Sequence, residues 1–393
     1  MDNICEITIL GYAFGGSSFG RLTDGRVCFV RNGVPGDKLK ISLTKEKKNF
    51  AEGEIIEVIE PSKDRITPLC PYAKDCPGCS YLYTTYDVEF EWKNKFFRDF
   101  LTRNPFQSEE ITILPGVKAS ERFNWRNKIT LSCRNGKLGY IGNDNKTQVP
   151  IEQCLLANEN INIAIKEFDK NAATSNRITW RNSDKGIYCD GLPSCPEYLY
   201  TQLGNLKFAI PPKGFFQINL DMATKLVDTT VEFVKESVAN DNTTTLLDLY
   251  CGVGVFSIAC ASAIPSLNCR GVEVEPKSIR AAKHNARHNK TAIQCKYFAS
   301  KSEDAFYDIS QGLPMDKTIL LLDPPRTGVE KSLIEKILKK KPAKIIYISC
   351  GPDTLQRDLK LLSSLYKVTK AQMFDLFPST SHFESITFLE KRP

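Results

Sequence analysis

The spacing of hydrophobic residues changes along this chain of 393 residues. Up to about residue 60, short runs of alternating apolar and polar residues are separated by turn sequences such as Asp24-Gly25 and Pro35-Gly36. Several short strands at this spacing predict a small β-barrel, which we expect over residues 1–61. The expected strands are 4–10, 26–31, 38–43 and 53–59.

The C-terminal part, residues 211–393, has a different pattern, in which helical periodicity alternates with continuous apolar runs. A helix near 220–238 precedes the first apolar run. This alternation predicts an α/β domain with a parallel, doubly wound sheet. The expected strands are 245–250, 269–274, 318–323, 344–349 and 385–390.

Residues 62–210, between these two parts, follow neither pattern. They begin with a cysteine-rich loop, continue with a helical stretch near 88–103, and then contain β-like segments. We expect a small α+β domain here, and the helical segment 88–113 is a candidate to pack on the C-terminal domain instead. The β-like segments are 127–134, 137–141 and 177–188.

Composition narrows the environment of the protein. Lysine and arginine number 53 against 46 aspartates and glutamates, and the net charge of +7 is compatible with a nucleic-acid partner. The chain has no apolar run long enough for a membrane helix, and residues 1–6 lack the features of a signal peptide. We therefore expect a soluble, cytoplasmic protein, whose 14 cysteines do not form a disulfide framework.

Three cysteines, Cys70, Cys76 and Cys79, lie on one short loop with prolines and a glycine. Iron–sulfur clusters are held by four thiolates, commonly three close together and one remote, so this spacing favours a cluster. Structural zinc sites usually show two closely spaced ligand pairs, and here only Cys76 and Cys79 form such a pair. Zinc and unliganded thiols are the alternatives. The candidates for the remote ligand are Cys133, Cys154, Cys189 and Cys195.

Four predicted strands of the C-terminal domain end in residues with distinct chemistry. The first ends in a turn with Gly252 and Gly254, the third in Asp323, and the fourth in the thiol of Cys350. Ligands of open α/β sheets bind at the carboxyl ends of the strands, so we expect one pocket, with Cys350 as a candidate nucleophile. Glu273, at the end of the second strand, is suited to bind ribose hydroxyls.

The glycine turn itself distinguishes between classes of cofactor. A dinucleotide-binding fingerprint has a third glycine, and Ser257 stands at that position here. A pyrophosphate-binding loop is therefore less favoured than a site for S-adenosylmethionine, which carries no phosphate. The alternative is a tight structural turn without a ligand.

Two further segments contain candidate functional residues. His382 and Glu384 precede the last strand, and in an extended segment their side chains point to the same side, where either could transfer a proton. The run 215–219 sets two phenylalanines beside Gln217, which suits stacking on a base and hydrogen bonding to it. Core packing with a helix cap at Asn219 is the other interpretation of this run.

Together, these motifs resemble those of the RNA (uracil-5-)-methyltransferase family. The likeness is closest to the 23S ribosomal RNA enzymes that carry a TRAM domain and an iron–sulfur cluster, and it covers almost the whole chain. It implies an OB-like TRAM domain that binds RNA, a central domain with a [4Fe–4S] cluster, and a Rossmann-like class I methyltransferase domain. The matching segments are Phe215-Phe-Gln-Ile-Asn219, Asp248-Leu-Tyr-Cys-Gly-Val-Gly-Val-Phe256, Gly271-Val-Glu273, Asp323-Pro-Pro-Arg-Thr-Gly328, Ser349-Cys350, Arg357-Asp-Leu359 and Phe377-Pro-Ser-Thr-Ser-His-Phe-Glu384.

The resemblance also implies roles for individual residues. Cys350 would be the nucleophile that adds to C6 of the target uracil, and Glu384 the base that removes the C5 proton. Gly351 is a departure, because the family usually has asparagine after the nucleophile. The residues at cofactor or target-base positions are Gln217, Tyr250, Gly252, Glu273 and Asp323. The implied cluster ligands are Cys70, Cys76, Cys79 and Cys154, which favours Cys154 over its rivals.

The expected function is methylation of uridine C5 in RNA, on 23S ribosomal RNA, with transfer RNA as the alternative substrate. Two other classes remain open. The missing third glycine opposes an iron–sulfur oxidoreductase, and the intact Cys350 and Glu384 oppose a non-catalytic RNA-binding protein. We expect RNA as the partner, no membrane contact, no protein partner and a monomer.

Overall fold

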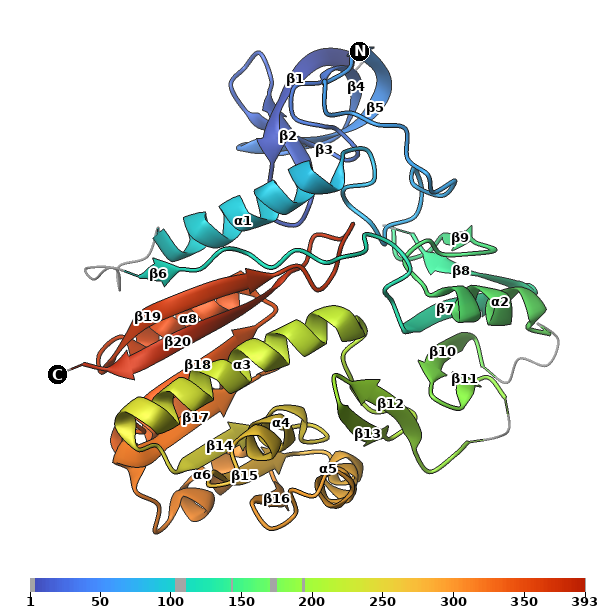
Figure 1. Cartoon of the computed structure of the whole chain (residues 1–393). Coiled ribbons are helices and arrows are strands. Elements are labelled where there is room, and N and C mark those ends of the chain that lie inside the picture. The colour runs from blue at the N-terminus through green and yellow to red at the C-terminus, as the bar shows by residue number, and fades with distance from the viewer. Residues whose placement is uncertain (1–3, 103–110, 143, 170–174, 193–194, 393) are drawn as a thin grey trace.

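The computed structural model describes residues 4–102, 111–142, 144–169, 175–192 and 195–392. The chain forms a β-barrel at its N-terminal end, a small sheet in its middle and a large sheet covered by helices (Figure 1). None of the helices in these ranges combines the length and the apolar character that a membrane crossing requires.

The barrel closes with its five strands in the order β1-β2-β3-β5-β4, so it leaves no free strand edge. Alternate side chains point inward, and Ile9, Val30, Leu39 and Ile41 are at most 1% exposed. The predicted barrel is confirmed, although the four-residue β2 is too short to show an alternation in the sequence. The strands are β1 (Ile4–Tyr12), β2 (Ser18–Arg21), β3 (Val27–Val30), β4 (Lys38–Glu46) and β5 (Phe50–Glu60).

The small sheet has the strand order β11-β10-β7-β8-β9. The helix α2 (Glu159–Glu167) packs on it through Ile161 and Ile165. A separate hairpin of β12 (Leu199–Leu203) and β13 (Leu206–Ile210) follows and leads toward the large sheet. The strands of the small sheet are β7 (Lys128–Arg134), β8 (Lys137–Ile141), β9 (Gln148–Pro150), β10 (Arg177–Ser183) and β11 (Gly186–Cys189).

The large sheet has eight strands in the order β16-β15-β14-β17-β18-β20-β19-β6. The first five strands in this order are parallel; four of them were predicted, whereas the edge strand β16 was not. The prediction is wrong for the last strand, β20 (Glu384–Lys391), which runs antiparallel to β18 and to β19 (Tyr366–Phe374). The loop 375–383 joins β19 directly to β20, whereas parallel neighbours need a longer crossover connection. The parallel strands are β14 (Thr245–Leu249), β15 (Asn268–Glu273), β16 (Cys295–Ala299), β17 (Thr318–Leu322) and β18 (Lys344–Ser349).

Helices cover both faces of the large sheet, so it is doubly wound. One face carries α3 (Leu220–Asp241), α4 (Val255–Ala263) and α5 (Pro276–His288). The other carries α6 (Ser302–Ser310), α7 (Lys331–Lys340) and α8 (Pro352–Leu362).

The helix α1 (Tyr86–Thr102) joins the second face, where its residues Phe97 and Leu101 are buried. The short strand β6 (Thr112–Ile113) then pairs with β19 at the edge of the large sheet. The described parts of the segment 88–113 therefore pack on the C-terminal domain. Residues 103–110 of that segment lie outside the described residues.

Candidate active site

A cavity lies at the carboxyl ends of β14 and β17, where the sequence predicts a ligand site. Its wall consists of the loop after β14, the start of α3 and the segment before that helix. Four of the five residues predicted to bind a cofactor line it: Gln217, Tyr250, Gly252 and Asp323. Most other lining residues are apolar, and few polar groups in an apolar wall are typical of a small-molecule site.

The loop after β14 contains three residues with a left-handed backbone, Tyr250 (φ 64°), Gly252 (φ 55°) and Gly254 (φ 85°). For a tyrosine this conformation costs roughly 1–2 kcal/mol, and such strain is concentrated at functional sites. The Gly252 amide donates to Glu273 Oε2 (3.2 Å), and the Glu275 amide donates to Glu273 Oε1 (2.9 Å). Glu273 does not line the cavity, but these two bonds fix its carboxylate beside it.

Two aspartates at the carboxyl ends of the neighbouring strands β14 and β17 have perturbed acidity. Burial raises the pKa of Asp248 to about 7, and burial together with the charge of Asp248 raises the pKa of Asp323 to about 7. Asp248 Oδ2 accepts a hydrogen bond from the Ser257 amide (3.2 Å), and its Oδ1 has no partner among the described residues. Sequence reasoning missed Asp248, and only its burial with an unused acceptor marks it as a functional candidate.

Cys350 directly follows β18, and Glu384 is the first residue of β20. These strands are antiparallel, and their last pair is Ser349 with Ser385. The same register carried one residue further sets Cys350 opposite Glu384. Directly opposite residues of an antiparallel pair have Cβ atoms roughly 4.5–5.5 Å apart. The residues predicted to act as nucleophile and base therefore meet at one edge of the sheet.

Asp323 and Arg326 belong to the same electrostatic group as these two residues. Burial raises the pKa of the Cys350 thiol to about 11; Glu384 and Asp323 add to this effect, and Arg326 opposes it. Burial also raises the pKa of Glu384 well above its usual value, again with Asp323 adding and Arg326 opposing. Sequence reasoning gave Arg326 no role, although a nearby cation favours the charged form of both groups.

Of the second interpretation of the segment before α3, the helix cap at Asn219 is confirmed, and core packing holds for Phe216 alone. Asn219 caps the helix, because its side chain accepts a hydrogen bond from the Met222 amide (3.3 Å). Its Nδ2 also donates to the Leu376 carbonyl (3.0 Å) and so ties α3 to the loop after β19. Phe216 is buried, whereas Phe215 is 71% exposed.

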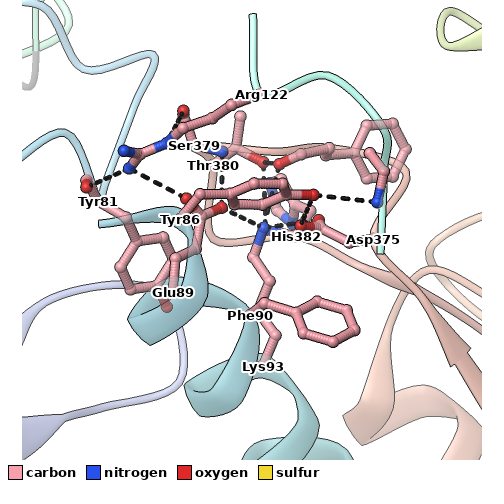
Figure 2. Close-up of polar contacts among 12 residues, drawn as sticks. Tyr81, Tyr86, Glu89, Phe90, Lys93, Arg122, Asp375, Ser379, Thr380 and His382 are labelled. Atoms are coloured by element: carbon pink, nitrogen blue, oxygen red, sulfur yellow. Dashed lines mark hydrogen bonds and ion pairs between the residues drawn. The ribbon is translucent and has the colours of Figure 1, made fainter. Parts of the chain in front are cut away.

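The loop that precedes Glu384 is held by a buried group of charges on α1 (Figure 2). Lys93 Nζ donates to Glu89 Oε1 and to Asp375 Oδ1, both at 2.8 Å, and to the Phe377 carbonyl at 3.2 Å. The side chains of Lys93, Glu89 and Asp375 are fully buried. Burial alone would lower the pKa of Lys93, but the two carboxylates raise it, so the amine stays charged.

Ser379 lies at the centre of this loop and has a left-handed backbone (φ 67°). Its amide donates to Glu89 Oε1 (2.6 Å), and its hydroxyl accepts a hydrogen bond from Arg122 Nε (3.2 Å; Figure 2). Its carbonyl accepts a hydrogen bond from the Ser80 amide (2.8 Å). Because Ser80 directly follows Cys79, the cysteine-rich loop is bonded to the loop that precedes Glu384.

His382 lies in the same loop, since β20 begins only at Glu384. The expectation that His382 and Glu384 point to the same side of one strand therefore does not apply, because His382 is outside β20. Its ring meets that of Phe377 edge-on, with centroids 6.3 Å apart. Burial and nearby cations lower the pKa of His382, so its imidazole is neutral at pH values near 7.

The four cysteines predicted to bind a cluster, Cys70, Cys76, Cys79 and Cys154, line one cavity. The Tyr140 hydroxyl lies 3.6 Å from the Cys154 sulfur as a hydrogen-bond donor. No three His, Cys, Asp or Glu side chains in the described ranges are grouped closely enough to hold a single metal ion. The four thiols therefore line the same cavity, but they are not close enough together to bind one metal ion.

The three rival cysteines are not in this cavity. Cys133 and Cys189 are buried in the hydrophobic core of the small sheet. Cys195 is exposed, and its sulfur lies 3.6 Å from the Tyr188 hydroxyl. Among the described cysteines, the geometry therefore favours Cys154 as the remote member of the set.

Comparison with known proteins identifies both ends of the chain. Residues 195–392 match the tRNA (uracil-5-)-methyltransferase family, and residues 3–56 match the TRAM domain. A tRNA (uracil(54)-C(5))-methyltransferase of Schizosaccharomyces pombe is 30% identical over 91% of this chain and 72% of that protein. An uncharacterized RNA methyltransferase of Thermosynechococcus vestitus is 29% identical over 98% of this chain and 97% of that protein.

Among solved structures, the fold is similar to that of a Pyrococcus abyssi tRNA (uracil-54, C5)-methyltransferase in complex with S-adenosyl-L-homocysteine. The two share 21% identity with a TM-score of 0.76, over 98% of this chain and 100% of that one. The family match covers half of the chain and includes β14, β17 and β18, at whose carboxyl ends Asp248, Asp323 and Cys350 lie. The chain thus belongs to the tRNA (uracil-5-)-methyltransferase family, and it is an S-adenosylmethionine-dependent RNA (uracil-5-)-methyltransferase with an N-terminal TRAM domain.

Proposed function

We propose that this enzyme methylates C5 of a uridine through a covalent intermediate on Cys350. The Cys350 thiolate adds to C6 of the uracil, and the new S–C6 bond makes C5 nucleophilic. S-Adenosylmethionine, when bound, supplies the methyl group that C5 receives. Glu384 then takes the C5 proton, the S–C6 bond breaks with its electron pair returning to sulfur, and the thiolate is regenerated.

The observation that carries this proposal is the antiparallel register of β18 and β20, whose last pair is Ser349 with Ser385 and whose next position on the two chains is Cys350 and Glu384. The nucleophile and the base must reach adjacent carbons of one ring, and opposite residues of an antiparallel pair are close enough for this. Asp323 supports the placement of the cofactor beside Cys350, because it lines the cavity and its charge also raises the pKa of the Cys350 thiol. Arg326 favours the thiolate that the first step requires.

The cavity at the ends of β14 and β17 is the proposed site for S-adenosylmethionine. Glu273 suits the ribose hydroxyls, because its carboxylate is fixed by the amides of Gly252 and Glu275 and retains acceptor capacity. The unused Oδ1 of Asp248 adds a further acceptor at the strand tip. Gln217 and Tyr250 line the cavity beside the exposed ring of Phe215, which suits a planar base.

RNA that contains 5-fluorouridine tests the covalent mechanism. Fluorine at C5 leaves no proton for Glu384 to remove, so the enzyme with S-adenosylmethionine should form a stable RNA–protein adduct on a denaturing gel. Cys350→Ala should form no adduct, whereas Cys195→Ala, which removes an exposed thiol elsewhere, should form it normally. An adduct with Cys350→Ala would refute the assignment of the nucleophile.

We also propose that Cys70, Cys76, Cys79 and Cys154 hold a [4Fe–4S] cluster. The shared cavity supports this set. Each thiolate of such a cluster binds a different iron, so the sulfurs are spread more widely than around a single ion. The bound cluster would supply bonds that tie the loop 70–79 to the small sheet. Through Ser80 and Ser379, that loop also supports the segment before Glu384.

For the substrate, we propose 23S ribosomal RNA, which the motif resemblance favours. Transfer RNA is the second candidate, because the relatives from S. pombe and P. abyssi are both named for uracil-54 of tRNA. Mapping 5-methyluridine in both RNAs from a strain that lacks this gene separates them. Loss of the base from tRNA alone would exclude the ribosomal substrate.

A further inference from the structure

A hollow on the surface of α5 and the β12–β13 hairpin combines cationic and aromatic side chains. We call it the α5 patch and define it by Tyr198, Tyr200, Arg280, Lys283, His284 and Arg287. Glu197 is the one acidic residue that lines the patch. The patch and the cofactor cavity have no lining residue in common. The patch is therefore a separate feature of the surface, on the face of the sheet opposite α1 (Figure 1).

The positive charge of the patch is not neutralised within the protein. Arg280, Lys283 and Arg287 are exposed and lie three to seven residues apart, which sets them on one side of α5. The helix contains no acidic residue. No ion pair in the described part of the chain involves any of these three side chains. Three free cations on one helical face are suited to consecutive phosphates of a nucleic acid.

Flat aromatic rings lie beside these cations. The Tyr198 ring stacks on the imidazole of His284, with centroids 5.5 Å apart and planes at 24°. The Tyr200 ring meets the same imidazole at 6.3 Å, and Lys185 Nζ lies 5.4 Å from the centre of the Tyr200 ring. Surfaces that bind single-stranded RNA combine such rings, on which bases stack, with a cationic groove for the backbone.

The patch is also rigid, because two asparagines join the helix to the hairpin. Asn285 accepts a hydrogen bond from the Ala209 amide (2.7 Å), and its Nδ2 donates to the carbonyls of Ala209 (3.0 Å) and Val253 (3.1 Å). One turn later, Asn289 makes the same two-way contact with Lys207, at 3.2 and 2.8 Å. Val253 is part of the glycine turn, so the patch is fixed relative to the cofactor cavity.

We propose that the α5 patch is a second RNA-binding surface, which holds a single-stranded segment of the substrate away from the target uridine. The proposal rests on the RNA methyltransferase activity but not on the covalent mechanism. The helix α5 follows β15, and β15 is three strand positions from β18, which carries Cys350. At about 4.8 Å per strand this is roughly 14 Å across the sheet. Only an RNA that extends several nucleotides beyond the target can therefore contact both places.

The test compares the triple variant Arg280→Ala, Lys283→Ala and Arg287→Ala with a control of equal charge. The control is Lys301→Ala, Lys331→Ala and Lys339→Ala, which removes three exposed lysines at α6 and α7, on the opposite face of the sheet. The probes are fluorescein-labelled oligouridylates of about 30 and about 6 nucleotides, since one binding module covers roughly 4–16 nucleotides. Affinity is measured by fluorescence anisotropy at several KCl concentrations.

For the long probe, the patch variant should bind about tenfold more weakly at low salt. Its salt slope should fall by about 2, because each phosphate contact on a single strand contributes about 0.7. The short probe and the control variant should be unaffected. The double variant Arg280→Lys and Arg287→Lys keeps the positive charge, so it should bind the long probe with most of the affinity that the triple variant loses. This result would exclude misfolding as the cause of the loss.

An equal loss in both triple variants would mean that only net charge matters and would overturn the proposal. Unchanged binding of the long probe to the patch variant would do the same. The 5-fluorouridine adduct of the unmodified enzyme is scored separately. Its absence would refute the covalent mechanism and leave the conclusion about the patch standing.

Discussion

Cys350 follows and Glu384 precedes the pair of Ser349 and Ser385, which is the last pair between the antiparallel strands β18 and β20. Cys350 is at the end of β18 and Glu384 at the start of β20. In a parallel sheet, the end of one strand and the start of its neighbour lie at opposite edges. The reversed direction of β20 is therefore what brings the thiol and the carboxyl group to the same edge.

Replacement of Glu384 by glutamine should separate the two halves of the reaction. The Cys350 thiol can still add to C6, but the C5 proton has no acceptor, so turnover should fall by about 10²–10⁴-fold. The methylated RNA should accumulate on the enzyme, even with ordinary uridine, and intact-mass spectrometry measures it. A slow variant that shows no such adduct would argue against Glu384 as the base.

The rate of adduct formation on 5-fluorouridine RNA should rise between about pH 7 and about pH 9. The pKa of the Cys350 thiol is raised to about 11, so the fraction of thiolate still grows throughout this range. Each pH unit below the thiol pKa costs about tenfold in thiolate. Arg326→Gln should move the profile to higher pH, since Arg326 opposes both shifts. A flat profile at constant RNA affinity would contradict this expectation.

The buried Lys93 is expected to matter far more than an exposed lysine on the same helix. Lys93→Met leaves Glu89 and Asp375 buried without their cation, which costs about 3–5 kcal/mol of unfolding free energy. The matched control is Lys95→Met, which breaks an exposed pair with Asp99 and should cost less than about 1 kcal/mol. Denaturant unfolding measures both. Similar losses in the two variants would show that the buried group does not stabilise the fold.

Iron content tests the assignment of the four cysteines. Cys76→Ser and Cys154→Ser should each lose most of the protein-bound iron and the visible absorbance of the cluster, because each removes one of four ligands. Cys133→Ser, a change in the core of the small sheet, should keep its iron. Anaerobically purified protein that contains zinc, or an iron loss in Cys133→Ser alone, would overturn the assignment.

Much of the site could be predicted from local sequence. The mainly apolar strands β14 and β17 are completely buried, as expected of central strands, and Asp323 follows β17 at its tip. The glycine turn required positive φ at Gly252, and Asn219 before a helical run required a cap. These features depend on a few neighbouring residues, whose conformational preferences act within one turn or one strand.

Other features depend on residues far apart in the chain, and only the tertiary structure decided them. Lys93 and Asp375 are 282 positions apart, and nothing around either residue indicates that their charges meet in the core. Whether β20 pairs parallel or antiparallel with β18 depends on how the chain leaves β19. No helix lies between β19 and β20, so the chain reverses its direction between these two strands. The sequence by itself determined which residue types stand at the strand tips. Long-range packing decided that Cys350 and Glu384 share one edge, because strand direction and register are properties of the paired strands together.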